Sequence, residues 1–509
     1  MAQSKRTARA ATGAAATAAL VVLAACGGGD SAEGGGGDGE EGGALVIAGP
    51  EPLDNWDPLQ QANPAYMSMV FDTLIAWNAD GSGFEPMLAT EWEQTPEHIE
   101  FVLRDDAVFH DGTPIDADAV VQNIERIRDT PHNSQAVFAN VTEIVAVDET
   151  TVRLELSEPT GGILETLADW PGSIVAPATI EEGSFREPIG SAAFQYNADE
   201  SRIGSEIVVD AFPDYYNADE VGPSSVTYLE MTEPEQRFNA LQTGRANVIY
   251  GEGGQIDQAE AEGMDVVVYP KVQWAAMLSD VEGVFSDVNV RQAVCHGINS
   301  QQFLDAHYSG HGETASQIFR EGTSGFNPDV DNLYPYDVDA AIALLEEAGN
   351  PDVEFTLPTP DEYQPIYQVF ASQMEEIGIT VNLDVMPFGE FISTYNNGEA
   401  PMILFSNLAA HGPYAYYLTR YAPESGRNAH GVEYPELLAA VQEGAAAEDE
   451  ESAEESYQEF SRIALEEAYD CGQFYLTGIW ISDPEAVSGL EAIPGRIDTF
   501  NYMDVEISG

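Results

Sequence analysis

Basic side chains are the scarcest class of residue in this chain of 509 amino acids. There are 18 Lys and Arg against 88 Asp and Glu, which gives a formal net charge of −70. Lys271 is the only lysine outside the N-terminal segment. Binding to the phosphates of nucleic acid or of anionic membranes needs clusters of Lys and Arg, so we expect neither as a partner.

The acidic residues are spread along the whole sequence, between apolar positions that recur regularly. An acidic disordered tail is therefore a poor explanation of the charge, and we expect a folded body with an acidic surface. Such a surface keeps a protein soluble at high ionic strength, where salt screens the repulsion between like charges. We hypothesise a salt-rich, halophilic habitat.

Long apolar runs and the motifs of familiar enzymes are missing too. Beyond the N terminus no segment is apolar enough to span a membrane, which takes roughly 20 residues. The sequence has no Gly-x-Ser-x-Gly, no His-Glu-x-x-His, no phosphate-binding loop and no Cys-x-x-Cys. We expect a protein that is not an enzyme and needs no cofactor, with an exported hydrolase as the rival class.

Cysteine is rare, and the first of the three cysteines is the most informative residue of the chain. Cys26 follows Leu-Ala-Ala, behind a basic start (Lys5, Arg6, Arg9) and an apolar, Ala-rich run. A basic, then apolar, then small-residue order is that of a secretory signal peptide, which we place at residues 1–25. The arrangement resembles a bacterial lipobox, in which the Cys becomes the lipidated first residue. We therefore predict a lipid-anchored, extracytoplasmic protein, at the cell surface or in the periplasm.

Residues 26–43 lack any large apolar side chain and after Cys26 contain only Gly, Asp, Glu, Ser and Ala. Such a segment cannot bury enough surface to offset the entropy lost on ordering, so we expect a flexible linker. The first strand-like run starts directly after it, at Ala44. This order predicts a tether between a lipid and a globular body.

The other two cysteines, Cys295 and Cys471, leave two alternatives open. Outside the cell they can pair as a disulfide. Two buried free thiols are the alternative, and on sequence alone we favour it. Mass measured under non-reducing conditions distinguishes the two.

Strand and helix patterns alternate along the chain, which predicts an α/β fold. Residues 99–104 and 151–156 alternate apolar and polar as half-buried strands do, whereas residues 265–270 and 402–405 carry continuous apolar cores. Residues 338–348 have a helical pattern, with Asp337 and Gly349 as caps. We expect Val338, Ile342, Leu345 and Ala348 to form its apolar face.

Several segments carry motifs at consistent spacing. Residues 84–92 read Phe-Glu-Pro-Met-Leu-Ala-Thr-Glu-Trp, and residues 101–114 read Phe-Val-Leu-Arg-Asp-Asp-Ala-Val-Phe-His-Asp-Gly-Thr-Pro, before a predicted helix at 116–128. Residues 239–249, 285–294 and 336–349 continue the pattern in order. Over about residues 44–485 the chain resembles the family 5 solute-binding proteins of ABC transporters, the peptide, dipeptide and nickel type. His110 lies in a turn of this pattern, and we expect it to stabilise the turn rather than to act in catalysis.

The chain also departs from the pattern of that family. Residues 188–194 have lost a Gly and a Pro from the usual P-V-G-T-G-P-Y turn. Oligopeptide binders carry a W-x-x-D-Y stretch whose Asp pairs with the amino group of the peptide, and residues 406–413 contain no acid. The second departure argues against recognition of a free peptide amine by this loop.

The resemblance implies a two-lobed periplasmic-binding-protein fold (type II, with an extra subdomain) and a ligand cleft between the lobes. We expect lobe I at residues 44–65, 172–279 and 482–509, its extra subdomain at 66–171, and lobe II at 280–481. The implied function is capture of a peptide or peptide-like solute by a monomer that delivers it to ABC permease subunits. Oligosaccharides and metal chelates are alternative ligands, and a sensory lipoprotein without a role in transport is the other class.

Loops that follow strands or precede the crossings between lobes are the candidate ligand contacts. Trp and Tyr offer large rigid surfaces with a polar edge, although each can equally pack within a lobe. The candidates are Asn55, Trp56, Glu252, Trp274, Asn407, His411, Tyr414, Tyr416 and Trp480. Near His296, the pair His307 and His311 has the spacing of a helical metal site, but Ser309-Gly310 breaks the helix between them, so we expect no metal bound directly by the protein.

Overall fold

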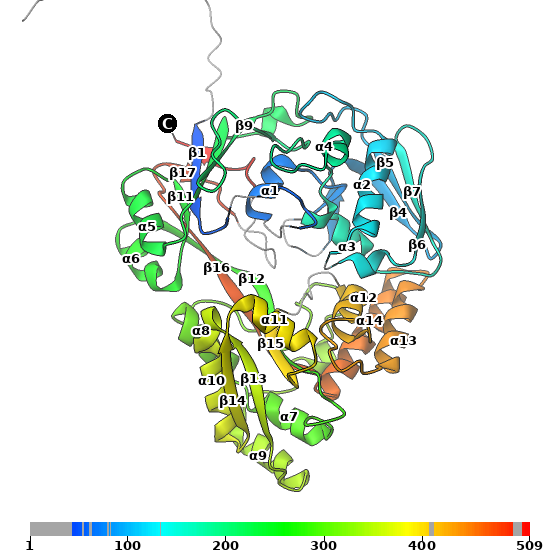
Figure 1. Ribbon diagram of the computed structural model, residues 1–509, viewed down its shortest axis with the longest axis vertical. Coiled ribbons are helices and arrows are strands. Elements are labelled where there is room, and N and C mark those ends of the chain that lie inside the picture. Colours follow the sequence, from blue (N-terminus) through cyan, green and yellow to red (C-terminus); the bar gives the residue numbers. More distant parts are fainter. Residues whose placement is uncertain are drawn as a thin grey trace, which may run out of the picture. The chain divides into compact units, whose positions relative to one another are not determined.

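The computed structural model describes residues 43–52, 55–60, 64–78, 81, 83–132, 134–406, 412–491 and 501–508. The predicted signal peptide, residues 26–42 of the predicted linker with Cys26, and two of the predicted ligand contacts, Asn407 and His411, lie outside these residues. The described body is a mixed α/β fold with two lobes, as predicted (Figure 1). No helix in the described part of the chain has the length and apolarity needed to cross a membrane.

One eight-stranded sheet runs through both lobes. Its strands, in spatial order, are β15 (Met402–Ser406), β12 (Asp265–Leu278), β16 (Asp470–Ser482), β11 (Val248–Tyr250), β1 (Ala44–Gly49), β10 (Ser225–Glu230), β9 (Glu206–Ala211) and β8 (Phe194–Tyr196). β1 is parallel to β10 and β11, and the other pairs are antiparallel. Residues 265–270 and 402–405 form strands as predicted, and β12 continues eight residues further, to Leu278.

β12 and β16 are long because they pass from one lobe to the other. One end of the pair, near Val267 and Trp480, packs in the core of lobe I, and the other end, near Met277 and Cys471, packs in the core of lobe II. The pairing shifts between Pro270 and Val272, and again between Trp274 and Ala276. In Figure 1 this ribbon joins the upper and lower halves.

Lobe I packs short helices against both faces of its part of the sheet, and a small two-stranded sheet adds to it. The helices are α1 (Pro64–Val70), α4 (Pro177–Glu182), α5 (Pro234–Gln242) and α6 (Ile256–Ala261), and the small strands are β17 (Val487–Ser488) and β18 (Glu506–Ile507). α1 lies within the range that we predicted for the extra subdomain. Its Tyr66 and Val70 nevertheless pack in the core cluster that contains Ile47 and Val226 of lobe I.

A four-stranded antiparallel sheet and two helices form a separate core of their own. It comprises β4 (Ala89–Gln94), β5 (His98–Leu103), β6 (Val141–Ala146), β7 (Thr151–Leu156), α2 (Ala117–Asp129) and α3 (Ile163–Leu167), with the hairpin β2 (Ile75–Trp77) and β3 (Phe84–Pro86) alongside. β5 buries every second residue, as its sequence pattern predicts, and β7 buries Val152 and Leu154 but leaves Leu156 only partly buried. Asp116 caps α2 by accepting a hydrogen bond from Ala119 N at 2.9 Å.

Lobe II holds two helical groups around its end of the ribbon. The first contains α7 (Val288–His296), α8 (Ser300–Tyr308), α9 (Val338–Glu347), α10 (Gln364–Glu376) and α11 (Phe388–Asn396) with the parallel pair β13 (Glu354–Pro360) and β14 (Thr380–Met386). The second contains α12 (Gly412–Tyr416), the π-helical turn η8 (Tyr417–Tyr421), α13 (Pro435–Ala445) and α14 (Glu450–Glu466). The position of all domain boundaries stays a prediction.

The predicted helix at 338–348 is present as α9, and Asp337 caps it through Ala340 N. The predicted apolar face was wrong at one position. Ala341 and Leu345 are buried, whereas Ile342 is 37% exposed. Positions three and four residues apart share a helix face, and α9 packs against α7 along a stripe through Ala341, so Ile342 turns outward.

Candidate functional site

The two lobes touch beside the ribbon, where the end of α8 meets the short helix η4 (Gly253–Gln255). Tyr308 ends α8 and is buried. A Cβ on Gly253 would lie 2.6 Å from the carbonyl oxygen of Tyr308, so only glycine allows this approach. Burial raises the pKa of Tyr308, the phenols of Tyr250 and Tyr363 raise it further, and the ammonium of Lys271 acts in the opposite direction. Groups from both lobes therefore surround this tyrosine.

Lys271, the only lysine in the described residues, lies at the first shift in the pairing of β12 with β16. Its Nζ donates to the hydroxyl of Tyr250 at 3.3 Å and lies 5.0 Å from the centre of that ring. Tyr250 ends β11, so the strand and the ribbon hold the cation at the junction of the lobes. The irregular pairing lets a side chain leave the sheet surface at this point.

Glu252 lies at the same junction and is oriented by a buried arginine. Arg237 is fully buried and donates to the carbonyl oxygens of Tyr250, Met231 and Thr232, at 2.6, 2.8 and 2.9 Å. Its remaining nitrogen donates to Glu252 Oε1 at 3.1 Å. Because three carbonyl groups fix the guanidinium of Arg237, its ion pair holds the carboxylate of Glu252 in one position. The side chain of Glu252 is 48% exposed.

A row of aromatic side chains continues from the junction along lobe II. Ring centres are 5.7 Å apart for His307 and Tyr363, 4.7 Å for Tyr363 and Trp274, 5.2 Å for Trp274 and Phe405, and 5.7 Å for Phe405 and Phe388. We call these five residues the aromatic row. Within the row, Trp274 is buried, whereas Phe388 is 41% exposed. The row offers flat apolar surface next to the charges of Glu252 and Lys271.

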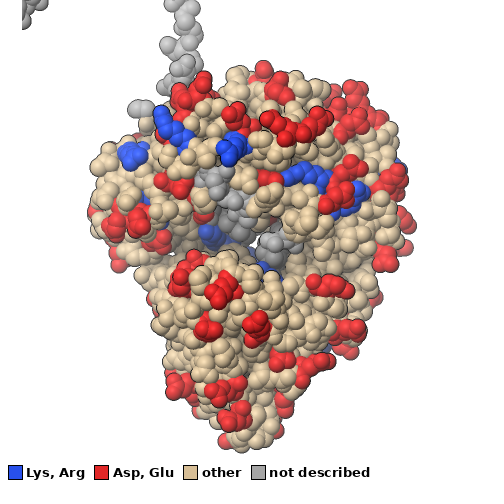
Figure 2. All heavy atoms as spheres, in the orientation of Figure 1, with Lys and Arg blue, Asp and Glu red and all other residues tan. Residues whose placement is uncertain are grey.

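Lobe II also touches the extra subdomain, through α12. A Cβ on Gly161 would lie 2.9 Å from Tyr414 Cβ, and one on Gly162 would lie 2.8 Å from Ala415 Cβ. Ala415 packs in the hydrophobic core of the extra subdomain. Figure 2 shows this face of the molecule hollowed between the part that carries α5 and α6 and the part that carries α11 and α12, with Lys and Arg atoms visible inside the hollow.

The structure divides the predicted ligand contacts among several cores. Trp56 and Trp480 are buried in one cluster of lobe I, Trp274 lies in the main cluster of lobe II, and Tyr414 and Tyr416 lie in a third. The three indoles expose 1–2% of their surface, so each packs against other rings. In this structure their burial favours a packing role, and of the aromatic candidates only Trp274 belongs to the aromatic row.

Two polar candidates are described, and they differ. Asn55 accepts a hydrogen bond from Asp57 N at 3.1 Å through its side chain, and its carbonyl accepts one from the hydroxyl of Tyr66 at 3.2 Å. These contacts order the loop after β1. Glu252 is the predicted contact that the structure places with charged and aromatic groups of both lobes.

His110 has a structural role. Nε2 of His110 lies 2.9 Å from the carbonyl oxygen of Ala192, and Nδ1 accepts from Gly190 N at 3.4 Å. Burial lowers the pKa of His110 to about 4, so the ring is neutral, as expected for a residue that ties a turn to a neighbouring segment. The helix with His307 ends before His311, and the described residues hold no group of three or more His, Cys, Asp or Glu arranged to bind a metal.

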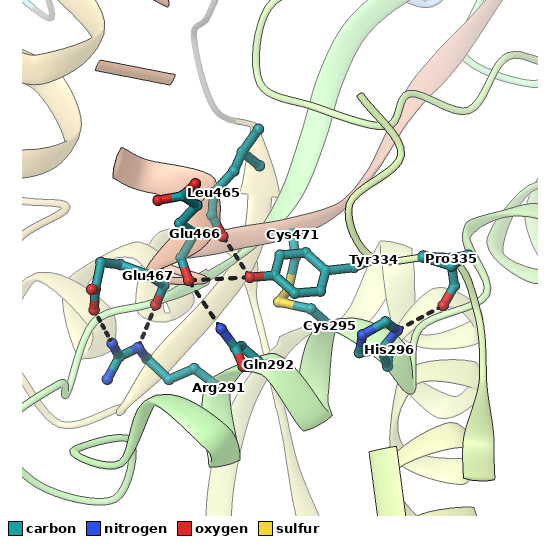
Figure 3. Close-up of a disulfide and its surroundings, with 10 residues drawn as sticks. All are labelled: Arg291, Gln292, Cys295, His296, Tyr334, Pro335, Leu465, Glu466, Glu467 and Cys471. Carbon is teal, nitrogen blue, oxygen red and sulfur yellow. Dashed lines mark hydrogen bonds and ion pairs between the residues drawn. A yellow bond between two sulfur atoms is a disulfide. The ribbon is translucent and has the colours of Figure 1, made fainter. Parts of the chain in front are cut away.

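Cys295 and Cys471 form a disulfide in the structure, with Cα atoms 5.4 Å apart (Figure 3). The alternative that we favoured, two free thiols, is not what the structure shows. The bond joins α7 to the start of β16. The side chain of Arg291 supports the same junction by donating to the carbonyl oxygen of Glu467 at 2.7 Å and to its carboxylate at 2.8 Å.

Comparison with known proteins identifies the family. The sequence profile of the bacterial extracellular solute-binding proteins, family 5, matches residues 83–429. The chain belongs to this family. It is therefore an extracytoplasmic binding protein of the kind that serves ABC importers.

Relatives of this family 5 protein have a range of named ligands. The chain is 23% identical to the di/tripeptide-binding protein 2 of Pseudomonas aeruginosa over 448 residues, with 78% of this chain and 82% of that protein covered. It is 23% identical to the nickel-binding periplasmic protein of Escherichia coli over 461 residues, with 82% and 86% covered. The structure matches that of DppA from Helicobacter pylori in complex with the peptide STSA, with a TM-score of 0.74, 21% identity, and 92% and 99% of the two chains covered. At this identity the structural match shows the fold alone.

Sequence reasoning did not identify as ligand contacts five residues that the structure places at the junction or in the aromatic row. They are Tyr250, Lys271, Tyr308, Tyr363 and Phe405. One signal was present in the sequence. Lys271 is the one lysine after the N-terminal segment and lies within a largely apolar run, which sets it apart in a chain with so few basic residues.

Proposed function

We propose that this family 5 protein captures a peptide or peptide-like solute outside the cytoplasm and delivers it to the permease of an ABC importer. Cys26 carries the lipid that holds it at the membrane, and residues 26–43 act as the tether. The protein acts as a monomer and binds its solute without chemical change. Closure of the lobes on the ligand selects the state that the permease recognises.

The observation that carries this proposal is the junction of the lobes. Glu252 and Lys271 supply one charge of each sign there, and the aromatic row supplies flat surface beside them. A short peptide has charged termini and apolar side chains, so its groups match those that line the junction. The relatives named for dipeptides, di- and tripeptides and glutathione support the same ligand class.

The disulfide supports the proposed compartment. Disulfides persist in oxidising surroundings and are rare in the cytosol. The bond between Cys295 and Cys471 fits a chain that is exported before it folds. The signal-like start, with Lys5, Arg6 and the apolar run before Cys26, supports the same route.

Native mass spectrometry of the protein purified from its own host tests the ligand class. We expect a bound species whose fragmentation spectrum is that of a peptide, and calorimetry with that peptide returns a saturable 1:1 isotherm. A bound oligosaccharide or metal chelate would replace the proposed ligand and leave the binding function standing. Steady turnover of the bound species would contradict it.

Two carboxylate variants separate binding at the junction from a general effect of charge. Glu252→Gln removes the charge that Arg237 holds at the junction, and we expect it to weaken binding of the co-purified ligand. Glu260→Gln removes the same charge from the exposed side of α6 and serves as the control. Equal affinity of both variants and the wild type would place the ligand elsewhere.

The anchor is tested by the variant Cys26→Ser. We expect the wild type in the membrane fraction and labelled by a radioactive fatty acid, and the variant unlabelled and released. A labelled variant would contradict lipidation at Cys26.

A further inference from the structure

A cavity of about 340 Å³ opens on lobe II between the end of α7, the start of α8, the start of β16 and the segments 314–316 and 332–336. We call it the lobe II cavity. The disulfide between Cys295 and Cys471 forms part of its wall, and Figure 3 shows that bond with Tyr334, another lining residue. Sites for small molecules begin at a volume of about 300 Å³, so this cavity has room for one.

The lobe II cavity is separate from the junction of the lobes. Ser300, the first residue of α8, lines the cavity, whereas Tyr308, the last, meets Gly253 at the junction. A helix rises by about 1.5 Å per residue, so about 12 Å of helix lies between the two places. Neither Glu252 nor Lys271 lines the cavity.

The wall of the cavity is uncharged. The described residues that line it include no Asp, Glu, Lys, Arg or His, in a chain with 88 acidic residues. A cationic ligand would therefore find no carboxylate here, and an anionic one would find no cation while the net charge of −70 repels it. Taking an ion out of water without a partner is costly, so the lining favours an uncharged ligand.

Several hydrogen-bond donors of the wall have no acceptor. Gln473 is 2% exposed, and its Nε2 has no hydrogen-bond partner among the described residues. The terminal torsion of a glutamine is broad, so the amide can turn toward an occupant of the cavity. The backbone N–H groups of Ser300 and Gln301 begin α8 and likewise donate to no described carbonyl group, and Asn299 caps the helix without a side-chain hydrogen bond.

Two other lining side chains are held so that they accept. Gln301 Nε2 donates to Asp305 Oδ1 at 3.2 Å, and the hydroxyl of Ser316 donates to Asp331. A carboxylate only accepts, so these bonds use the hydrogens and leave Oε1 of Gln301 and the lone pairs of Ser316 Oγ for a ligand. Donors and acceptors thus occur together in the wall. A hydroxyl group both donates and accepts, and it matches such a wall.

Two tyrosines add flat surface. The hydroxyl of Tyr334 donates to the carbonyl oxygen of Leu465 at 2.7 Å, which fixes the ring. Tyr336 is 41% exposed, and its hydroxyl donates to Glu376 at 3.1 Å. Rings held in this way offer apolar area to the C–H groups of a ligand, while the amides and hydroxyls bind its oxygens.

We propose that the lobe II cavity is a second ligand site and that it binds one small uncharged polyhydroxy compound of the size of a monosaccharide. The site would act beside the one at the junction of the lobes. The inference does not rest on the ligand proposed for that junction.

Calorimetry in high salt with matched probes tests the ligand class. The neutral probes are a panel of hexoses and hexitols, and the charged probes are gluconate and glucosamine, which carry a carboxylate or an ammonium on the same kind of skeleton. We expect a saturable 1:1 isotherm with at least one neutral probe. Gluconate and glucosamine should bind about 10-fold more weakly or not at all.

Variants and hydrogen exchange locate the site. Gln473→Met keeps the size of the side chain and removes the amide, so binding of the neutral probe should fall about 10-fold. Since that amide nitrogen has no partner, the variant should melt no lower than the wild type without ligand. Tyr336→Ala removes an exposed ring and should also weaken binding. Gln442→Met on the exposed side of α13 is the control and should bind as the wild type does.

With the neutral probe at saturation, hydrogen exchange should slow at residues 298–301 and 471–473 and stay unchanged at 250–253. Protection at 250–253 alone, or full binding by both Gln473→Met and Tyr336→Ala, overturns the second site. Equal binding of gluconate or glucosamine overturns the selection of uncharged ligands. The absence of a saturable isotherm with every neutral probe overturns the inference as a whole.

Discussion

The buried charged residues of this fold differ in how many of their polar atoms have hydrogen-bond partners. Arg237 and Arg420 are fully buried, and each has several acceptors. Asp72 is 2% exposed, and its Oδ2 has no hydrogen-bond partner. A buried carboxylate without sufficient partners favours its protonated form, and burial raises the pKa of Asp72 from its ordinary 3.8 to about 7, although Ser191 and Arg104 act in the opposite direction.

The raised pKa of Asp72 predicts a dependence of stability on pH. The folded state holds this proton more tightly than the unfolded chain, so the contribution of Asp72 is fully present below pH 3.8 and is lost as the pH rises through about 7. Between those two values the loss amounts to roughly 4 kcal/mol. Asp72→Asn removes this pH-dependent contribution to the free energy of unfolding. We expect the variant to gain stability relative to the wild type as the pH rises, in denaturant titrations at a series of pH values.

Asp214→Asn removes a charge from the exposed surface and is the matched control for net charge. A stability difference between Asp72→Asn and the wild type that stays constant over this pH range would show that the carboxyl titrates normally.

At the scale of elements, the long ribbon of β12 and β16 places the functional groups. Its two shifts in register fall beside Lys271 and Trp274, where the strands leave one core and enter the other. Helices then meet across the junction through small residues. Gly253 of η4 against the end of α8 is one such contact, and Gly161 and Gly162 against α12 are another.

The glycine contact beside α8 predicts an effect on ligand affinity. In Gly253→Ala the new Cβ would lie 2.6 Å from the backbone oxygen of Tyr308, which a side-chain rotation cannot relieve. Overpacking of this kind costs about 1–3 kcal/mol where the lobes touch. We expect ligand affinity in calorimetry to fall roughly 5- to 150-fold. Gly254→Ala is the neighbouring control, since its Cβ would meet nothing within 4 Å. Equal affinity in both variants would show that ligand binding does not need this contact.

The disulfide predicts a contribution to stability from one link between elements. It closes a sequence separation of 176 residues by joining α7 to β16. We expect Cys295→Ser with Cys471→Ser to lower the free energy of unfolding by about 2–4 kcal/mol. Denaturant titration under oxidising conditions measures the loss, and adding reductant should lower the wild type to the level of the variant. A peptide map without reductant that shows both cysteines as free thiols would contradict the bond.

At the scale of the whole molecule, charge is the dominant feature. If every Lys and Arg neutralised one acidic residue, 70 acidic residues would remain without a basic partner. Acidic side chains are scattered over the whole visible face in Figure 2, with few basic ones among them. Their mutual repulsion destabilises the compact state at low ionic strength.

That repulsion predicts stabilisation by salt. The screening length falls from about 10 Å at about 0.1 M salt to about 3 Å at about 1 M. We expect the melting temperature to rise by several degrees over this range in NaCl, and by a similar amount in KCl. A flat or falling melting temperature would contradict adaptation to high salt.

The sequence by itself determined the family and much of the local structure. Alternation in residues 99–104 and 151–156 predicted β5 and β7, and the caps around residues 338–348 predicted α9, because these patterns depend on neighbours two to four positions away. The resemblance predicted two lobes, and the structure confirmed them. The prediction of a lipid anchor also comes from the sequence alone, since Cys26 lies outside the described residues.

Only the tertiary structure decided which side chains meet. Burial depends on segments far apart in the chain, so the sequence could not tell that Trp56 and Trp480 pack in one core while Trp274 packs in another. The same holds for Cys295 and Cys471, whose bond depends on how α7 meets β16. Whether a buried nitrogen of an arginine has an acceptor is likewise a property of the folded interior, and the Nη1 of Arg427, which has none among the described residues, became visible only in three dimensions.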